Sequence, residues 1–66
     1  MFGIDWLRNG VPIDREASVL SEAEAVAAAK SRALDVVKRH PLREPDSFRL
    51  TDAAGKVVGI FLIDLG

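Results

Sequence analysis

The chain has 66 residues, the size of one small domain, and it contains no cysteine and a single histidine. A disulfide is therefore excluded, and so is a zinc site built from cysteines or from several histidines. Nine basic and ten acidic residues give a net charge of −1, which argues against a global attraction to nucleic acid or anionic lipid.

The first predicted element is a β-hairpin with strands at about residues 2–8 and 11–17. Asn9 and Gly10 between them form the dipeptide that type I′ two-residue loops favour, because both loop positions need a positive φ. Regular alternation from this loop assigns the two faces of the hairpin. The core face then holds Phe2, Ile4, Trp6, Val11 and Ile13, and the outer face holds Asp5, Leu7, Pro12, Asp14 and Glu16.

Pro12 indicates where this hairpin lies in the sheet. A two-residue loop pairs Pro12 with Leu7 without hydrogen bonds between them, so the first strand does not need the N–H that proline lacks. The nitrogen of Pro12 faces outward instead, where a further strand would need a donor. The second strand is therefore predicted to be a sheet edge, protected by its proline and by the neighbouring charges.

A helix is predicted over residues 22–39. Ser21 and Glu24 match the S-x-x-E capping box, and Lys38 and Arg39 place positive charge in the last turn. The stripe that faces the sheet consists mostly of alanine, so the helix can lie close to the sheet and the large core side chains must come from the strands. This stripe is Ala25, Val26, Ala29, Ala33, Val36 and Val37.

The second predicted hairpin has strands at about residues 47–52 and 56–63. The loop between them, Asp52-Ala53-Ala54-Gly55, suits a type I turn followed by a left-handed glycine. Pairing outward from this loop directs one set of apolar residues toward the helix. This set is Phe48, Leu50, Val58, Ile60 and Leu62.

The last strand is apolar on its other face as well, where Val57, Phe61 and Ile63 lie in the predicted register. One helix covers only one face of a sheet, so these residues and Leu7 are expected to be exposed and to bind a protein partner or a second copy of the chain. Apolar residues on both faces also favour a central strand, which gives the predicted strand order 2-1-4-3.

No catalytic residue, metal ligand or cofactor site is predicted. His40 has Glu44 and Asp46 nearby in sequence, but a histidine just before a proline at a helix end usually caps carbonyl groups. The carboxylates of Asp5, Asp14 and Glu16 are interpreted as solvated protection of the sheet edge.

Nucleic-acid binding is the alternative function. Residues 30–43 carry five basic residues against one acidic residue, and Lys38, Arg39 and Arg43 would contact phosphates. The structural interpretation of the same residues is a basic helix end that complements the helix dipole. Because no aromatic stacking surface with interleaved basic residues is visible, nucleic acid is the less favoured partner.

The segments FGIDWLRNGVPID, SEAEAVAAAKSRALDVV and FRLTDAAGKVVGIFLI together resemble a group of short uncharacterised bacterial proteins with the order hairpin, helix, hairpin. The resemblance covers nearly the whole chain and implies a fold without an activity. The N-terminus lacks the features of a signal peptide and no apolar run reaches about 18 residues, so a cytoplasmic protein without a membrane span is expected.

The sequence therefore predicts an α+β domain in which one helix packs on one face of a four-stranded, mainly antiparallel sheet. The expected function is that of a small non-catalytic protein-interaction module.

Overall fold

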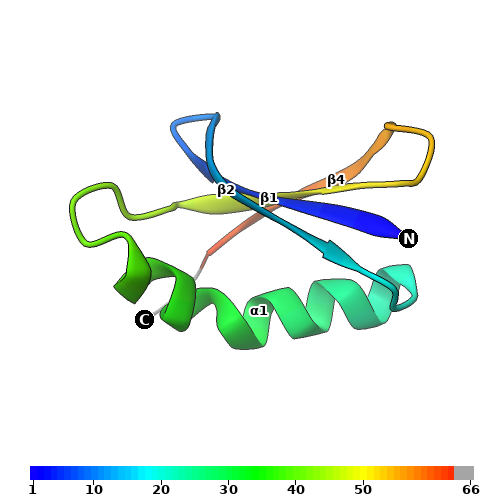
Figure 1. Ribbon diagram of the computed structural model, residues 1–66, viewed down its shortest axis with the longest axis horizontal. Helices are drawn as coiled ribbons and strands as arrows, with labels where there is room; N and C mark the ends of the chain where they lie inside the picture. Colours follow the sequence, from blue (N-terminus) through cyan, green and yellow to red (C-terminus); the bar gives the residue numbers. More distant parts are fainter. Residues whose placement is uncertain (64–66) are drawn as a thin grey trace.

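One helix crosses one face of a four-stranded antiparallel sheet in this protein (Figure 1). The computed structural model describes residues 1–63. The elements in chain order are β1 (Phe2–Arg8), β2 (Val11–Ser18), α1 (Glu22–Arg39), β3 (Ser47–Thr51) and β4 (Val57–Leu62). The predicted α+β class and ββαββ order are therefore confirmed.

The strand order is β2-β1-β3-β4, and the predicted order 2-1-4-3 is wrong. β3 lies beside β1, with Phe48 opposite Trp6, and β4 forms the second edge of the sheet. An ion pair accompanies this order, because Arg49 on β3 reaches Asp5 on β1. The apolar character of β4 on both faces therefore does not mark a central strand. The prediction that β2 is an edge is confirmed.

Helix α1 begins and ends at the residues that the capping signals indicate. The N–H of Glu24 donates to the Ser21 hydroxyl oxygen (3.4 Å), and that hydroxyl donates to the Glu24 carboxylate (2.7 Å). Alanines fill most of the buried stripe, and the sheet supplies the large side chains of the core. These are Ile4, Trp6, Phe48 and Leu50, all fully buried. No helix within residues 1–63 combines the length and the apolar character needed to cross a membrane.

A bulge in β2 changes which residues of the first hairpin face the helix. Asn9 and Gly10 have positive φ values of 51° and 79°, as the type I′ loop requires, and Leu7 pairs with Pro12 as predicted. The register then shifts, so that Asp14, and not Ile13, lies opposite Trp6. The side chains of Asp14 and Glu16 consequently turn toward α1, and their predicted position on the outer face is wrong.

A second bulge inverts the faces of β4. Gly55 has a φ of 85° and the N–H of Asp52 donates to the carbonyl oxygen of Lys56 (2.9 Å), as the predicted loop requires. Thr51 lies opposite Val57, but the register shifts at this point and Leu50 lies opposite Gly59. Every residue after the bulge therefore faces the side opposite to the one predicted.

Gly59 shows why this register fits. A Cβ atom at Gly59 would lie 2.9 Å from the ring of Phe61, so that ring occupies the space a side chain would fill. Phe61 lies opposite Phe48, and the two rings stack with centroids 5.2 Å apart. The shifted register thus gives the core another aromatic ring, and it turns Ile60 and Leu62 to the outer face.

Candidate functional site

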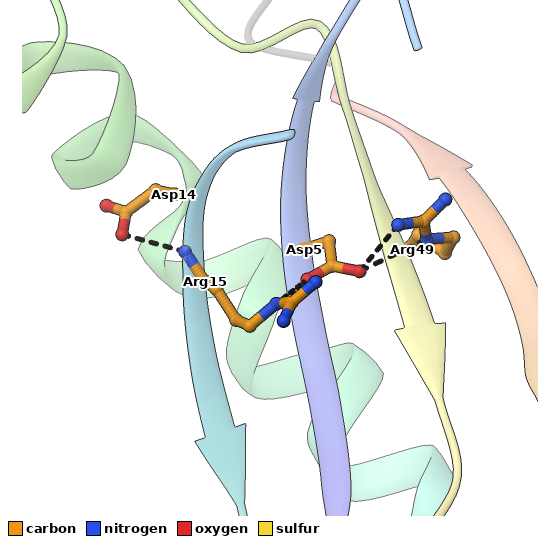
Figure 2. Close-up of polar contacts among 4 residues, drawn as sticks. All are labelled: Asp5, Asp14, Arg15 and Arg49. Atoms are coloured by element: carbon orange, nitrogen blue, oxygen red, sulfur yellow. Dashed lines mark hydrogen bonds and ion pairs between the residues drawn. The ribbon is translucent and has the colours of Figure 1, made fainter. Parts of the chain in front are cut away.

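The outer face of the sheet, which is turned away from α1, carries a buried carboxylate at its centre. Asp5 on β1 is only 5% exposed and lies between two arginines on neighbouring strands. Arg15 on β2 donates through Nε to Oδ1 of Asp5 (2.7 Å), and Arg49 on β3 donates through Nε (3.1 Å) and Nη2 (2.8 Å) to Oδ2. Figure 2 shows the three side chains in a row across the strands, with the helix behind the sheet.

The charge state of Asp5 follows from two opposing effects. Burial raises the pKa of a carboxyl group, but the hydrogen bonds and positive charges of Arg49 and Arg15 outweigh it, so the pKa of Asp5 lies below its ordinary value. The carboxylate therefore stays ionised at neutral pH and neutralises part of the charge of both guanidinium groups. The outer face over β2, β1 and β3 is therefore polar and keeps a net positive charge, because two guanidinium groups share one carboxylate.

The outer face over β4 is apolar. The exposed fractions are 47% for Val57, 42% for Val58, 62% for Ile60 and 81% for Leu62. None of the six residues of β4 is charged. The surface formed by these four side chains and by the free edge of β4 is called the β4 surface below.

The backbone of β4 is also open on the side away from β3. The N–H of Ile63 donates to the carbonyl oxygen of Asp46 (3.0 Å), so the polar groups of Ile63 point toward β3. Because these groups alternate in direction along a strand, Ile60 and Leu62 direct their N–H and C=O groups outward. Within residues 1–63, β4 pairs with β3 alone. The β4 surface therefore combines apolar side chains with unpaired backbone donors and acceptors.

The four residues predicted to form an interaction surface are separated by the structure. Val57 is exposed as predicted, but Leu7 is only 3% exposed, although it is on the outer face. Phe61 and Ile63 pack against the core under α1, so their predicted exposure on the outer face is wrong. Ile60 and Leu62 take their place, and the only sequence signal for them is that β4 is apolar at nearly every position.

A second polar cluster joins β2 to the end of α1. His40 Nε2 lies 3.1 Å from Oδ2 of Asp14, and an Arg39 guanidinium nitrogen lies 3.9 Å from the same oxygen. The hydrogen bond to His40 lowers the pKa of Asp14 below its ordinary value, more strongly than partial burial raises it. Glu16 pairs in the same way with Arg32 of α1.

The predicted role of His40 is only partly right. Its backbone N–H caps the helix by donating to the carbonyl oxygen of Val37 (3.1 Å), whereas its ring bonds to Asp14 instead of capping carbonyl groups. Across residues 1–63 no hydroxyl group hydrogen-bonds to this ring, and no three residues among His, Asp and Glu are arranged to hold a metal ion.

The residues of the nucleic-acid alternative lie at the same end of the molecule. Lys38, Arg39 and Arg43 are exposed there. A shallow hollow of about 250 Å³ is lined by Arg39, His40, Pro41, Leu42 and Arg43. Since Arg39 is already near Asp14, Lys38 and Arg43 remain as the predicted phosphate contacts at this end.

Comparisons of the chain with protein-family models, with curated proteins and with solved structures give no match. The resemblance to short bacterial proteins therefore stays a prediction.

Proposed function

We propose that this chain is a small non-catalytic protein-interaction module that binds its partner through the β4 surface. The observation that carries the proposal is the exposure of four apolar residues on an edge strand without charge. The free energy falls when a partner removes exposed apolar side chains from water. The unpaired backbone N–H and C=O groups of an edge strand form hydrogen bonds when another strand adds to that edge.

The chemistry of the β4 surface favours protein as the partner. An extended protein segment offers both backbone groups for the strand edge and apolar side chains for Ile60 and Leu62. A nucleic acid offers mainly phosphates, and these need free cations near the site. The two arginines of the outer face, Arg15 and Arg49, share the carboxylate of Asp5, so the net positive charge near the β4 surface is less than the two side chains alone would give.

The basic helix end supports the alternative function, in which Lys38, Arg39 and Arg43 bind nucleic acid. Retention of the protein on DNA across a salt series tests this alternative, because phosphate contacts weaken steeply as salt rises. Retention that is lost with salt, and lost in a Lys38→Ala/Arg43→Ala variant, would favour nucleic acid over the β4 surface.

The main proposal is tested by affinity capture from a native lysate with three baits: wild type, Ile60→Lys and Ala17→Lys. Ala17 is the matched control, because it is exposed on the outer face at the opposite edge strand. We expect wild type and Ala17→Lys to retain the same proteins, and Ile60→Lys to retain them about tenfold less, which corresponds to about 1.4 kcal/mol. Circular dichroism verifies that all three baits are folded. Equal recovery by the three baits contradicts the proposal, and so does specific recovery by none when wild type also stays a monomer at millimolar concentration.

A further inference from the structure

We infer that the partner of the β4 surface is a second copy of this chain. The two β4 strands pair in antiparallel orientation about a two-fold axis, and the two four-stranded sheets join into one. This inference rests on the proposed function, since it names the partner for the same surface.

The free backbone groups of β4 are complementary to those of another β4. Ile60 and Leu62 direct their N–H and C=O groups outward, as the hydrogen bond of Ile63 to Asp46 implies. When a second copy runs in the opposite direction with Ile60 opposite its Leu62, each of these residues faces a residue that also points outward. Both pairs then exchange N–H···O=C bonds, and the two-fold axis passes beside Phe61.

The side chains are complementary in the same register. Ile60 and Leu62 lie on the outer face. In the joined sheet, Ile60 of each copy would therefore lie beside Leu62 of the other copy on that face. Apolar pairs at such cross-strand positions stabilise a sheet. The two-fold axis is perpendicular to the sheet, so both helices lie on the same face and the apolar side chains of both copies form one continuous patch on the other face.

Charge and backbone chemistry select β4 over β2 as the partner strand. β2 presents Pro12, which has no N–H, a bulge at Ile13, and the charge of Arg15 along its edge. Pairing of β4 with β2 of the next molecule would therefore lose hydrogen bonds, and it would produce an open-ended chain of molecules. β4 carries no charge, so two copies of it meet without like charges opposite each other.

The area available sets the strength of this association. A stable dimer buries roughly 800 Å² on each partner, which is nearly a fifth of the 4294 Å² surface of the chain. The edge of a six-residue strand is about 20 Å long and about 10 Å thick, so backbone pairing covers only about 200 Å². The exposed side chains of β4 and its neighbours must supply the rest. We therefore expect a dissociation constant in the micromolar to millimolar range.

The experiment compares the association of wild type, Ile60→Pro and Ala17→Pro by sedimentation equilibrium up to millimolar concentration. Both prolines remove an N–H that points away from the sheet, so neither breaks a hydrogen bond within the chain. Wild type and Ala17→Pro should shift toward twice the mass of one chain as concentration rises. Ile60→Pro should keep the mass of one chain, with an unchanged circular dichroism spectrum.

Amide hydrogen exchange of wild type keeps the inference testable if a proline variant does not fold. The amides of Ile60 and Leu62 should become at least several-fold more protected as concentration rises, while the outward-directed amide of Ala17 should not change. A wild type that keeps the mass of one chain at millimolar concentration, or protection that does not depend on concentration, overturns the inference.

The outcomes separate this inference from the proposed function. If wild type is a monomer but the captured proteins still depend on Ile60, the second copy is excluded and a strand of another protein takes its place. If neither self-association nor Ile60-dependent capture is found, both proposals fail.

Discussion

The two edge strands of the sheet, β2 and β4, each contain a bulge, but β2 carries charged side chains and β4 carries only apolar ones. Each contains a one-residue bulge a few positions from its hairpin loop. In β2 the bulge turns Asp14 and Glu16 toward basic residues of α1, whereas in β4 it turns Ile60 and Leu62 toward solvent. Along its edge β2 presents a proline, a bulge and the charge of Arg15, whereas β4 presents uncharged apolar residues.

A bulge thus determines which side chains of a strand face the helix, but it does not determine whether the edge of that strand binds a partner. The shift in β2 forms ion pairs that attach the edge to the helix. The shift in β4 places Phe61 on Phe48 in the core and exposes the residues on either side of Phe61. The gain in core packing on one face of β4 is thus coupled to an apolar surface on the other face.

The largest expected effect comes from placing a proline at a position of β4 whose N–H points toward β3. Phe61→Pro removes a ring that stacks on Phe48 and an N–H that points toward β3. Loss of a fully buried aromatic side chain costs about 3–5 kcal/mol, which is as much as a domain of this size typically has in total. Phe61 is only partly buried, so its ring contributes less than this, but the lost hydrogen bond to β3 adds to the cost. We expect Phe61→Pro to be unfolded by circular dichroism while Ile60→Pro stays folded. Similar urea midpoints for the two variants would contradict both the inward N–H and the core contact assigned to Phe61.

A smaller effect is expected at the centre of the polar half of the outer face. Asp5→Asn replaces a buried carboxylate that accepts hydrogen bonds from Arg15 and Arg49, and we expect a loss of about 2 kcal/mol. Urea denaturation at neutral pH measures the loss, and Asp35→Asn on the exposed side of α1 is the matched control. A loss no larger than that of the control would show that β2 and β3 do not depend on Asp5.

The contribution of Asp5 should also disappear in acid. Because its pKa is lower in the folded chain than in the unfolded chain, the unfolded chain binds more protons between the two values and stability rises with pH there. The contribution is complete above the ordinary value of 3.8 and is lost as the pH falls through the lowered value. The difference between wild type and Asp5→Asn should therefore shrink below about pH 4. A difference that is the same at pH 3 and pH 7 would contradict this assignment.

The smallest effect is expected at the β2 edge. Pro12→Thr restores an outward N–H, but the bulge and the charge of Arg15 remain. We expect the free energy of unfolding to change by no more than about 0.5 kcal/mol, and the sedimentation behaviour to stay that of wild type. Stronger association of Pro12→Thr would show that the proline alone closes this edge.

Part of the fold could be predicted because its signals are local. The left-handed φ of Asn9 and Gly10, the cap at Ser21 and the loop closed by Gly55 each depend on residues within a few positions of one another. The sequence could not predict which residues of β2 and β4 face the helix, because each strand shows an acceptable pattern of alternating side chains with or without the bulge. Of the four residues predicted to form an interaction surface, Val57 is exposed and Leu7 is buried, whereas Phe61 and Ile63 pack against the core. Their role in binding stays a prediction.

The amino-acid sequence by itself determined the elements, their order and the identity of β2 as a sheet edge, because turn, cap and proline chemistry act over short distances. Only the tertiary structure decided the strand order and the two bulges. These depend on contacts between distant residues: Arg49 with Asp5 across 44 positions, His40 with Asp14 across 26, and the ring of Phe61 on Phe48. A one-residue shift costs little locally, so the packing of the whole core chooses the register, and with it the side chains that reach the surface.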